Sequence, residues 1–99
     1  MDDWPFADPT SVASITVRQI VWDGHPILLV SRDAEDGSWQ FLTRGKFNVA
    51  DAMLVSLGSM VERDHSLVEV ADLPLGWRAR RSAPASPWHC EPEQEVSTD

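Results

Sequence analysis

Asp36-Gly37-Ser38-Trp39-Gln40-Phe41 is the stretch of this chain that decides its fold, because a polar turn leads directly into a strand that begins at a tryptophan. A second stretch has the same plan: Asp72-Leu73-Pro74-Leu75-Gly76-Trp77-Arg78-Ala79-Arg80. Asp-Gly and Pro-x-Gly are turn signals because glycine adopts the positive φ that tight turns require. Tryptophan suits the strand that follows because it fills a pleated, half-buried surface. The two stretches therefore predict a sheet with strands that begin at Trp39 and Trp77.

Three strands are expected around the first stretch. Ser14–Trp22 is rich in β-branched residues and alternates, which is typical of a strand with one wetter face, to which Thr16 belongs. Ile27–Ser31 is apolar at consecutive positions and is expected in the centre of the sheet. Trp39–Leu42 is the third strand, and two Asp-Gly turns separate the three. The pattern predicts an antiparallel meander in which each strand pairs with the next.

Residues 49–64 allow two interpretations. Their apolar residues recur at the spacing of one amphipathic helix. Alternatively, Met53–Val55 forms a short strand and Ser56 caps the helix that follows. Gly58 lies inside the helical pattern and disfavours a single long helix by about 1 kcal/mol relative to alanine. We favour the strand followed by the helix.

The second half of the chain predicts one more helix and one more strand. Ser66 is a candidate N-cap for a short helix over Leu67–Ala71, which Pro74 would end. Trp77–Arg81 is the last strand, with Arg78 and Arg80 on one of its faces. The predicted fold is α+β: an antiparallel sheet of about four or five strands, packed against one or two short helices.

The chain is short enough for a single domain. Residues 1–12 are expected to form an N-terminal arm, which Trp4 and Phe6 pin to the body by burying apolar area. Residues 13–83 form the α+β domain. Residues 84–99 are rich in proline and acids and are expected to be a largely disordered tail.

The order of these elements, together with the stretches Asp36–Phe41 and Leu73–Arg81, resembles the bacterial proteins grouped as domain-of-unknown-function family 2185. The resemblance covers about residues 13–89 and depends on the combination of the two turns, since each turn alone is common. It implies a small α+β protein without established catalytic residues. Some members of that family are placed among the immunity proteins of polymorphic toxin systems, so the resemblance also implies an immunity-type role.

The net charge of −8 is concentrated at the two ends of the chain. Residues 1–8 carry three acids and residues 91–99 carry four, and neither segment contains a base. The body between them holds nine acids against eight bases, so it is close to neutral. Nucleic-acid binding needs a basic surface. Only Arg78, Arg80 and Arg81 resemble one, so we expect no nucleic-acid partner.

A cytoplasmic protein is expected. The chain does not open on the charged and then apolar segments of a signal peptide. The longest apolar run, Ile27–Val30, is too short to cross a bilayer, so we expect no membrane association. Cys90 is the single cysteine and cannot form an internal disulfide. A monomer or a homodimer is compatible with this composition.

The titratable residues form no recognisable catalytic or metal-binding motif. His25, His65 and His89 have spacings that match no zinc site. Cys90 is expected to be a spectator thiol, because residues adjacent in sequence rarely bring their side chains face to face. The acidic turn over Asp33–Asp36 is expected to be solvated, since it lacks the ligand pattern of a calcium loop. We therefore expect no enzymatic activity, no metal and no cofactor.

The tryptophans carry the remaining functional hypothesis. Trp39 and Trp77 are expected to be core or half-core residues, because tryptophan contributes a large share of the burial in a small domain. Tryptophan and arginine are also enriched at interface hot spots. The candidate interaction residues are Trp22, Trp77, Arg78, Arg80 and Trp88. The sequence favours a non-enzymatic protein-interaction or immunity-type module; the alternative is a small-ligand-binding or enzymatic domain that uses a Trp-lined pocket.

Overall fold

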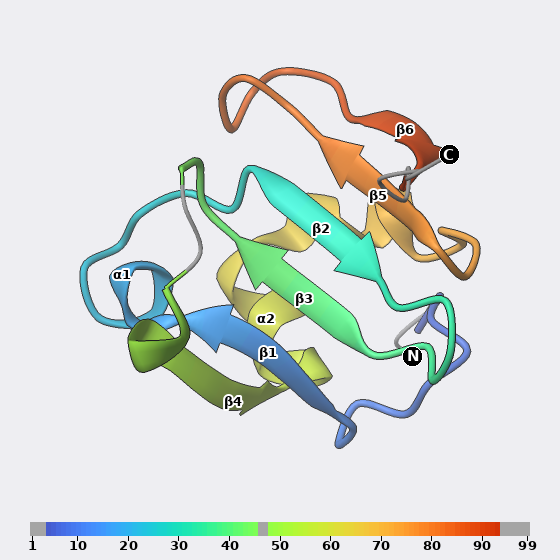
Figure 1. Cartoon of the computed structure of the whole chain (residues 1–99), viewed down its shortest axis with the longest axis horizontal. Helices are drawn as coiled ribbons and strands as arrows, with labels where there is room; N and C mark the ends of the chain where they lie inside the picture. Colours follow the sequence, from blue (N-terminus) through green and yellow to red (C-terminus); the bar gives the residue numbers. More distant parts are fainter. Residues whose placement is uncertain (1–3, 46–47, 94–99) are drawn as a thin grey trace, which may run out of the picture.

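The computed structural model describes residues 4–45 and 48–93 and has an α+β fold with one mixed sheet (Figure 1). The strands are β1 Ala13–Val17, β2 Leu29–Arg32, β3 Trp39–Leu42, β4 Ala52–Ser56, β5 Trp77–Arg80 and β6 His89–Pro92. The helices are α1 Arg18–Val21 and α2 Leu57–Arg63, with the 3₁₀ helices η1 Val49–Asp51 and η2 His65–Val70. The six strands lie in the order β4-β1-β3-β2-β5-β6. The predicted α+β class is confirmed, but the sheet has six strands where about four or five were predicted.

The predicted meander is wrong in its first strand. β2 and β3 pair antiparallel as expected, and β2 lies inside the sheet. β1, however, lies between β3 and β4, parallel to β3 and antiparallel to β4. The Asp-Gly turn at Gly24 therefore belongs to a crossover from β1 to β2, and it does not close a hairpin. The crossover carries the chain past β3 to β2, so β1 lies beside β3 and runs parallel to it. This parallel pair makes the sheet mixed.

The first strand is also shorter than predicted and has a different buried face. The chain leaves the sheet after Val17 and forms α1, so the predicted strand Ser14–Trp22 ends five residues early. Ser14 and Thr16 are buried, although Thr16 was expected on the wetter face. Their hydroxyls donate to the carbonyls of Val55 and Phe41, at 2.7 Å each. These hydrogen bonds to both neighbouring strands compensate for the loss of water around the two hydroxyls when they are buried.

The favoured interpretation of residues 49–64 is confirmed. β4 is followed at once by α2, and the Ser56 hydroxyl accepts a hydrogen bond from the Ser59 N–H at 3.2 Å. Gly58 lies where this helix passes close to Thr10. The Gly58 N–H donates to the Thr10 carbonyl at 2.9 Å, and a Cβ at Gly58 would lie 3.1 Å from the Thr10 side chain.

The next helix begins earlier than predicted and has a different cap. η2 starts at His65, and the Asp64 carboxylate accepts a hydrogen bond from the Ser66 N–H at 3.1 Å. Ser66 was the predicted cap, but its own hydroxyl donates to the same carboxylate at 2.7 Å. A carboxylate is a stronger acceptor than a hydroxyl, so Asp64 takes the capping position.

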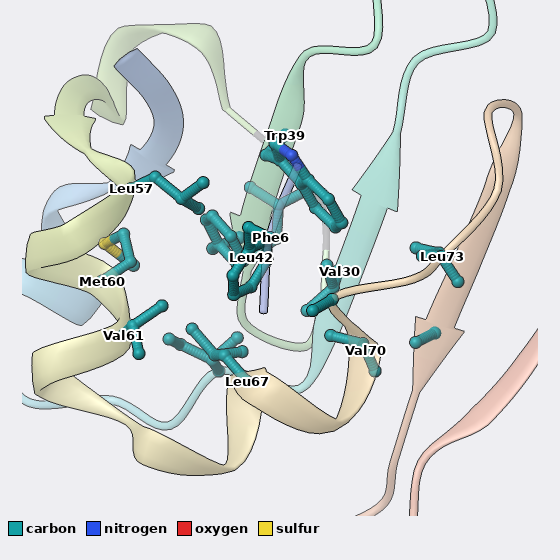
Figure 2. Close-up of a cluster of buried hydrophobic side chains, with 14 of the residues drawn as sticks. Phe6, Val30, Trp39, Leu42, Leu57, Met60, Val61, Leu67, Val70 and Leu73 are labelled. Carbon is teal, nitrogen blue, oxygen red and sulfur yellow. The ribbon is translucent and has the colours of Figure 1, made fainter. Parts of the chain in front are cut away.

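The core lies between one face of the sheet and the layer formed by α2 and η2 (Figure 1). Figure 2 shows Phe6 in the middle of this cluster, with Leu57 and Val61 of α2 on one flank and Val30 and Trp39 of the sheet on the other. The expected docking of the N-terminal arm is confirmed by the burial of Phe6.

Asp8 also fixes the arm, because its carboxylate accepts a hydrogen bond from the Trp39 indole at 3.0 Å. Trp4 stacks at an angle on Phe6, with 5.1 Å between the ring centres. The arm thus extends the aromatic core beyond the predicted domain start at residue 13.

The C-terminal region differs from the expected tail. Residues 89–92 form β6, which pairs antiparallel with β5 and extends the sheet. Proline and acids argued against a strand here, but Pro92 lies at the end of an edge strand, where a missing N–H is tolerated. Residues 94–99, the last part of the predicted tail, lie outside the described residues.

Candidate functional site

One face of the sheet carries no helix among the described residues, and we call it the open face, although Val17, Ser31 and Leu42 on it are buried. In the part of the chain that the structure describes, α2 and η2 pack on one side of the sheet, and no helix covers the other side (Figure 1). Residues that are opposite one another in the strand register have side chains on the same face. The register aligns one row across all six strands of this open face: Glu91, Arg78, Ser31, Gln40, Ile15 and Leu54. The row passes from charged at β6 and β5, through polar, to apolar at β1 and β4.

Glu91 joins two arginines at the charged end of this row. The Nε atoms of Arg78 and Arg80 lie 2.9 Å and 3.2 Å from the same carboxylate oxygen of Glu91. The hydrogen bond from Arg78, with the charge of Arg80, lowers the pKa of the Glu91 carboxyl below its ordinary value of 4.5. Arg80 remains 62% exposed, so its guanidinium still faces solvent on one side. The pair thus binds one carboxylate and has donors left for another.

A half-open hollow of about 850 Å³ lies beside these arginines. Arg44, which follows β3, and His89 also line it, and we call the hollow bounded by Arg44, Arg78, Arg80, His89 and Glu91 the arginine groove. Arg44 donates to the Ser82 carbonyl at 2.9 Å, which ties its side chain to the segment that follows β5. Guanidinium groups recognise carboxylates and phosphates through paired hydrogen bonds, so this groove has the chemistry of an anion-binding surface.

Arg81 supports one wall of the groove, which residues 82–88 form. Its guanidinium is buried, with Nη2 2.6 Å from the Asp64 carboxylate, and its Nε donates to the Ile27 carbonyl at 3.0 Å. The Trp88 ring lies against the same guanidinium, 4.1 Å from ring centre to the guanidinium carbon. These contacts fix residues 82–88, which contribute Ser82, Ser86 and Pro87 to the groove. Arg81 is therefore structural, and Arg44, Arg78 and Arg80 provide the surface chemistry.

The structure brings together some of the predicted interaction residues. Arg78 and Arg80 share the groove, and Trp88 lies half-buried behind its wall. Trp77 begins β5 on the opposite, core-facing side and is half-buried. Trp22 is 72% exposed, but it follows α1 beyond β1, which is three strands away from β5.

A Trp-lined pocket requires a tryptophan at the wall of a hollow. Neither the arginine groove nor a smaller hollow of about 190 Å³ between Gln19, Arg44 and Asp51 has a tryptophan in its lining. Trp39, by contrast, is buried in the core as expected.

Sequence reasoning missed Arg44, His89 and Glu91. Arg44 was placed in a polar loop, and the other two were placed in the tail, so no pairing could be drawn between β5 and β6. The signal available in the sequence was the alternation of Arg78 and Arg80 with Ala79, which places two arginines on one face of a strand. Such a face favours a neighbouring strand that carries an acid.

The other titratable groups have structural surroundings. The Asp33 carboxylate accepts hydrogen bonds from the N–H groups of Glu35 and Asp36, at 2.7 and 3.1 Å. This carboxylate therefore stabilises the backbone of its own turn. Hydrogen bonds from Ser38 lower the pKa of Asp36. Partial burial raises the pKa of the Cys90 thiol, which reduces its thiolate fraction.

Residues 4–45 and 48–93 contain no cluster of three or more His, Cys, Asp or Glu side chains placed to hold a metal ion. In the same residues, no helix has the length and apolar composition needed to span a bilayer.

No match was found among protein-family models, curated proteins or solved structures. The function of the chain is therefore inferred from the arginine groove and the open sheet face.

Proposed function

We propose that this chain is a non-enzymatic protein-interaction module that binds an acidic segment of a partner protein in the arginine groove. The observation that carries the proposal is the Glu91 carboxylate held between Arg78 and Arg80. The groove thus already binds the chemical group that it would recognise. A carboxylate from a partner can bind the exposed side of Arg80 and Arg44, or replace Glu91.

A protein partner fits this surface better than a nucleic acid. The chain has a net charge of −8, which repels a nucleic acid, with a charge on every phosphate, more strongly than a short segment that carries a few acids among apolar residues. The open face also ends in apolar side chains, with Leu54 74% exposed beside Ile15. A protein surface that combines acids with apolar residues complements both ends of this row, whereas a phosphate backbone complements only the arginines.

The resemblance to family 2185 adds one partner class. If the chain acts as an immunity protein, the bound acidic segment belongs to a toxin. Binding would then cover the part of the toxin surface that contains this segment. Arginine keeps its proton at all physiological pH values and serves poorly as an acid or base. The chemistry of the groove therefore favours binding over catalysis.

A fluorescence-anisotropy titration tests this proposal with a labelled peptide of alternating Glu and Leu residues. We expect Arg80→Gln and Arg78→Gln each to weaken binding by about tenfold, because each removes a charge-assisted hydrogen bond. Arg18→Gln is the matched control, because Arg18 is about as exposed as Arg80 and its ion pair with Asp51 joins α1 to η1, outside the arginine groove. Equal loss of affinity in all three variants would show only non-specific charge attraction and would contradict the proposal.

Glu91→Gln and a small anion separate the proposal from its alternative. Removing the internal carboxylate frees Arg78 and Arg80, so we expect Glu91→Gln to bind the peptide several-fold more tightly. A small-ligand-binding domain predicts instead that citrate raises the melting temperature while the peptide does not bind. That result would replace the protein partner with a small anionic ligand.

A further inference from the structure

We propose that β4 is a self-association edge, through which two copies of this chain join their sheets in antiparallel fashion. This inference does not depend on the arginine groove, which lies at the other end of the strand order. β4 is an outermost strand, and among the described residues it pairs with β1 alone. Its backbone therefore presents an unpaired edge to solvent.

The register identifies the backbone groups that form this edge. The Leu57 N–H donates to the Val12 carbonyl at 2.8 Å, in line with the antiparallel register of β1 and β4. Because donors and acceptors alternate in direction along an antiparallel strand, Met53 and Val55 face β1. Leu54 then directs both its N–H and its C=O outward, together with the C=O of Ala52 and the N–H of Ser56. The Ala52 N–H donates instead to the Val49 carbonyl, and the Ser56 carbonyl begins the hydrogen bonding of α2.

The two edges of the sheet differ in how they are protected. β6 contains Glu91 and Pro92, and charged residues and proline are the usual means of preventing edge-to-edge pairing. The sequence of β4 is Ala-Met-Leu-Val-Ser, without a charge or a proline. Leu54 is 74% exposed, and Val49, which precedes the strand, is 76% exposed. β4 therefore carries none of these protective residues and adds exposed apolar area.

A second copy is the occupant that this strand fits. A two-fold axis through Leu54 pairs each Leu54 with its equivalent and Ala52 with Ser56 of the other copy, so no like charges meet. The outward groups of one copy then satisfy those of the other. The apolar ends of the two open faces, Ile15 and Leu54, become continuous across the join. The two arginine grooves remain free at the far ends of the combined sheet.

Sedimentation equilibrium of the purified chain tests the proposal. The strand is only five residues long, so the interface is small and the concentration series must extend from about 1 to about 1000 μM. We expect the mass to rise from 11.1 kDa toward twice that value. Leu54→Lys should remain monomeric over the series, because it places two charges opposite each other at the axis. Leu75→Lys is the control, since Leu75 is also exposed but lies outside β4.

Disulfide trapping is a second readout that does not depend on a charged substitution. In a Cys90→Ser background, we expect Leu54→Cys to form a cross-linked dimer at least tenfold faster than Leu75→Cys under the same oxidant. Circular dichroism confirms that each variant is folded. A wild-type chain that stays at 11.1 kDa throughout, or equal cross-linking at the two positions, would overturn the proposal. In that case the edge could still accept a strand from a different protein, but not from a second copy.

Discussion

The guanidinium of Arg81 lies against the ring of Trp88, with its carbon 4.1 Å from the ring centre, and the same guanidinium forms an ion pair with Asp64 at 2.6 Å. Through these contacts one buried arginine connects β5, the start of η2 and the loop before β6. The arrangement supports the arginine groove without taking part in binding. It also makes the groove wall sensitive to a single substitution.

Arg81→Met is expected to lower the free energy of unfolding by about 3–5 kcal/mol, because it leaves the Asp64 carboxylate without its partner in a partly buried site. Arg81→Lys should recover only part of this loss, since an ammonium group cannot make the same forked set of hydrogen bonds or stack on Trp88 in the same way. Urea denaturation of the three proteins measures the difference. Full stability in the Lys variant would show that charge alone is sufficient.

The two strand-initiating tryptophans should differ in their contribution to stability. Trp39 is 2% exposed and bonds to Asp8, so Trp39→Ala should cost about 3–5 kcal/mol. Trp77 is only half-buried, so Trp77→Ala should cost about 1–3 kcal/mol, less than a full core position would. Chemical denaturation of both variants provides the comparison. Equal losses would contradict the assignment of Trp77 to the margin of the core.

The N-terminal arm should behave as part of the core. Phe6 is 5% exposed and meets the Trp39 ring edge-on, with 5.2 Å between the ring centres. We expect Phe6→Ala to cost about 3 kcal/mol or more in unfolding free energy. Leu75→Ala, at a 52% exposed position, serves as the control and should cost less than about 1 kcal/mol. A Phe6→Ala variant as stable as the control would show that the arm is dispensable.

Docking of β6 should weaken in acid. The ion pairs lower the pKa of Glu91 in the folded state, so their contribution is complete above the ordinary pKa of 4.5 and is lost as the pH falls through the lowered value. The melting temperatures of the wild type and Glu91→Gln should therefore differ at neutral pH and converge in strong acid. A difference that persists unchanged in acid would rule out the Glu91 ion pairs as its source.

Local signals in the sequence predicted the elements with strong local determinants. Trp39–Leu42 was predicted with the bounds that β3 has, and the cap at Ser56 separated β4 from α2 as proposed. These features depend on turns, caps and apolar spacing within a few residues. The arm was also predicted to dock, because Phe6 had no other reason to interrupt a polar segment.

The missed features depend on contacts between distant parts of the chain. Thr16 became a core residue because the Phe41 carbonyl, far along the sequence, accepts its hydroxyl. The parallel pairing of β1 with β3 follows from the insertion of β1 beside β4, which no local turn encodes. β6 forms because Arg78 and Arg80 provide partners for Glu91 in a segment with the composition of a tail. The candidate site was incomplete for the same reason.

The most direct test of the arginine groove is a ¹⁵N-detected titration of the arginine Nε–H signals with the Glu-Leu peptide. We expect the signals of Arg78, Arg80 and Arg44 to shift together and to saturate at one affinity, while the signal of Arg18 stays in place. Shifts spread equally over all exposed arginines, or confined to Arg18, would contradict binding of an acidic segment in the groove.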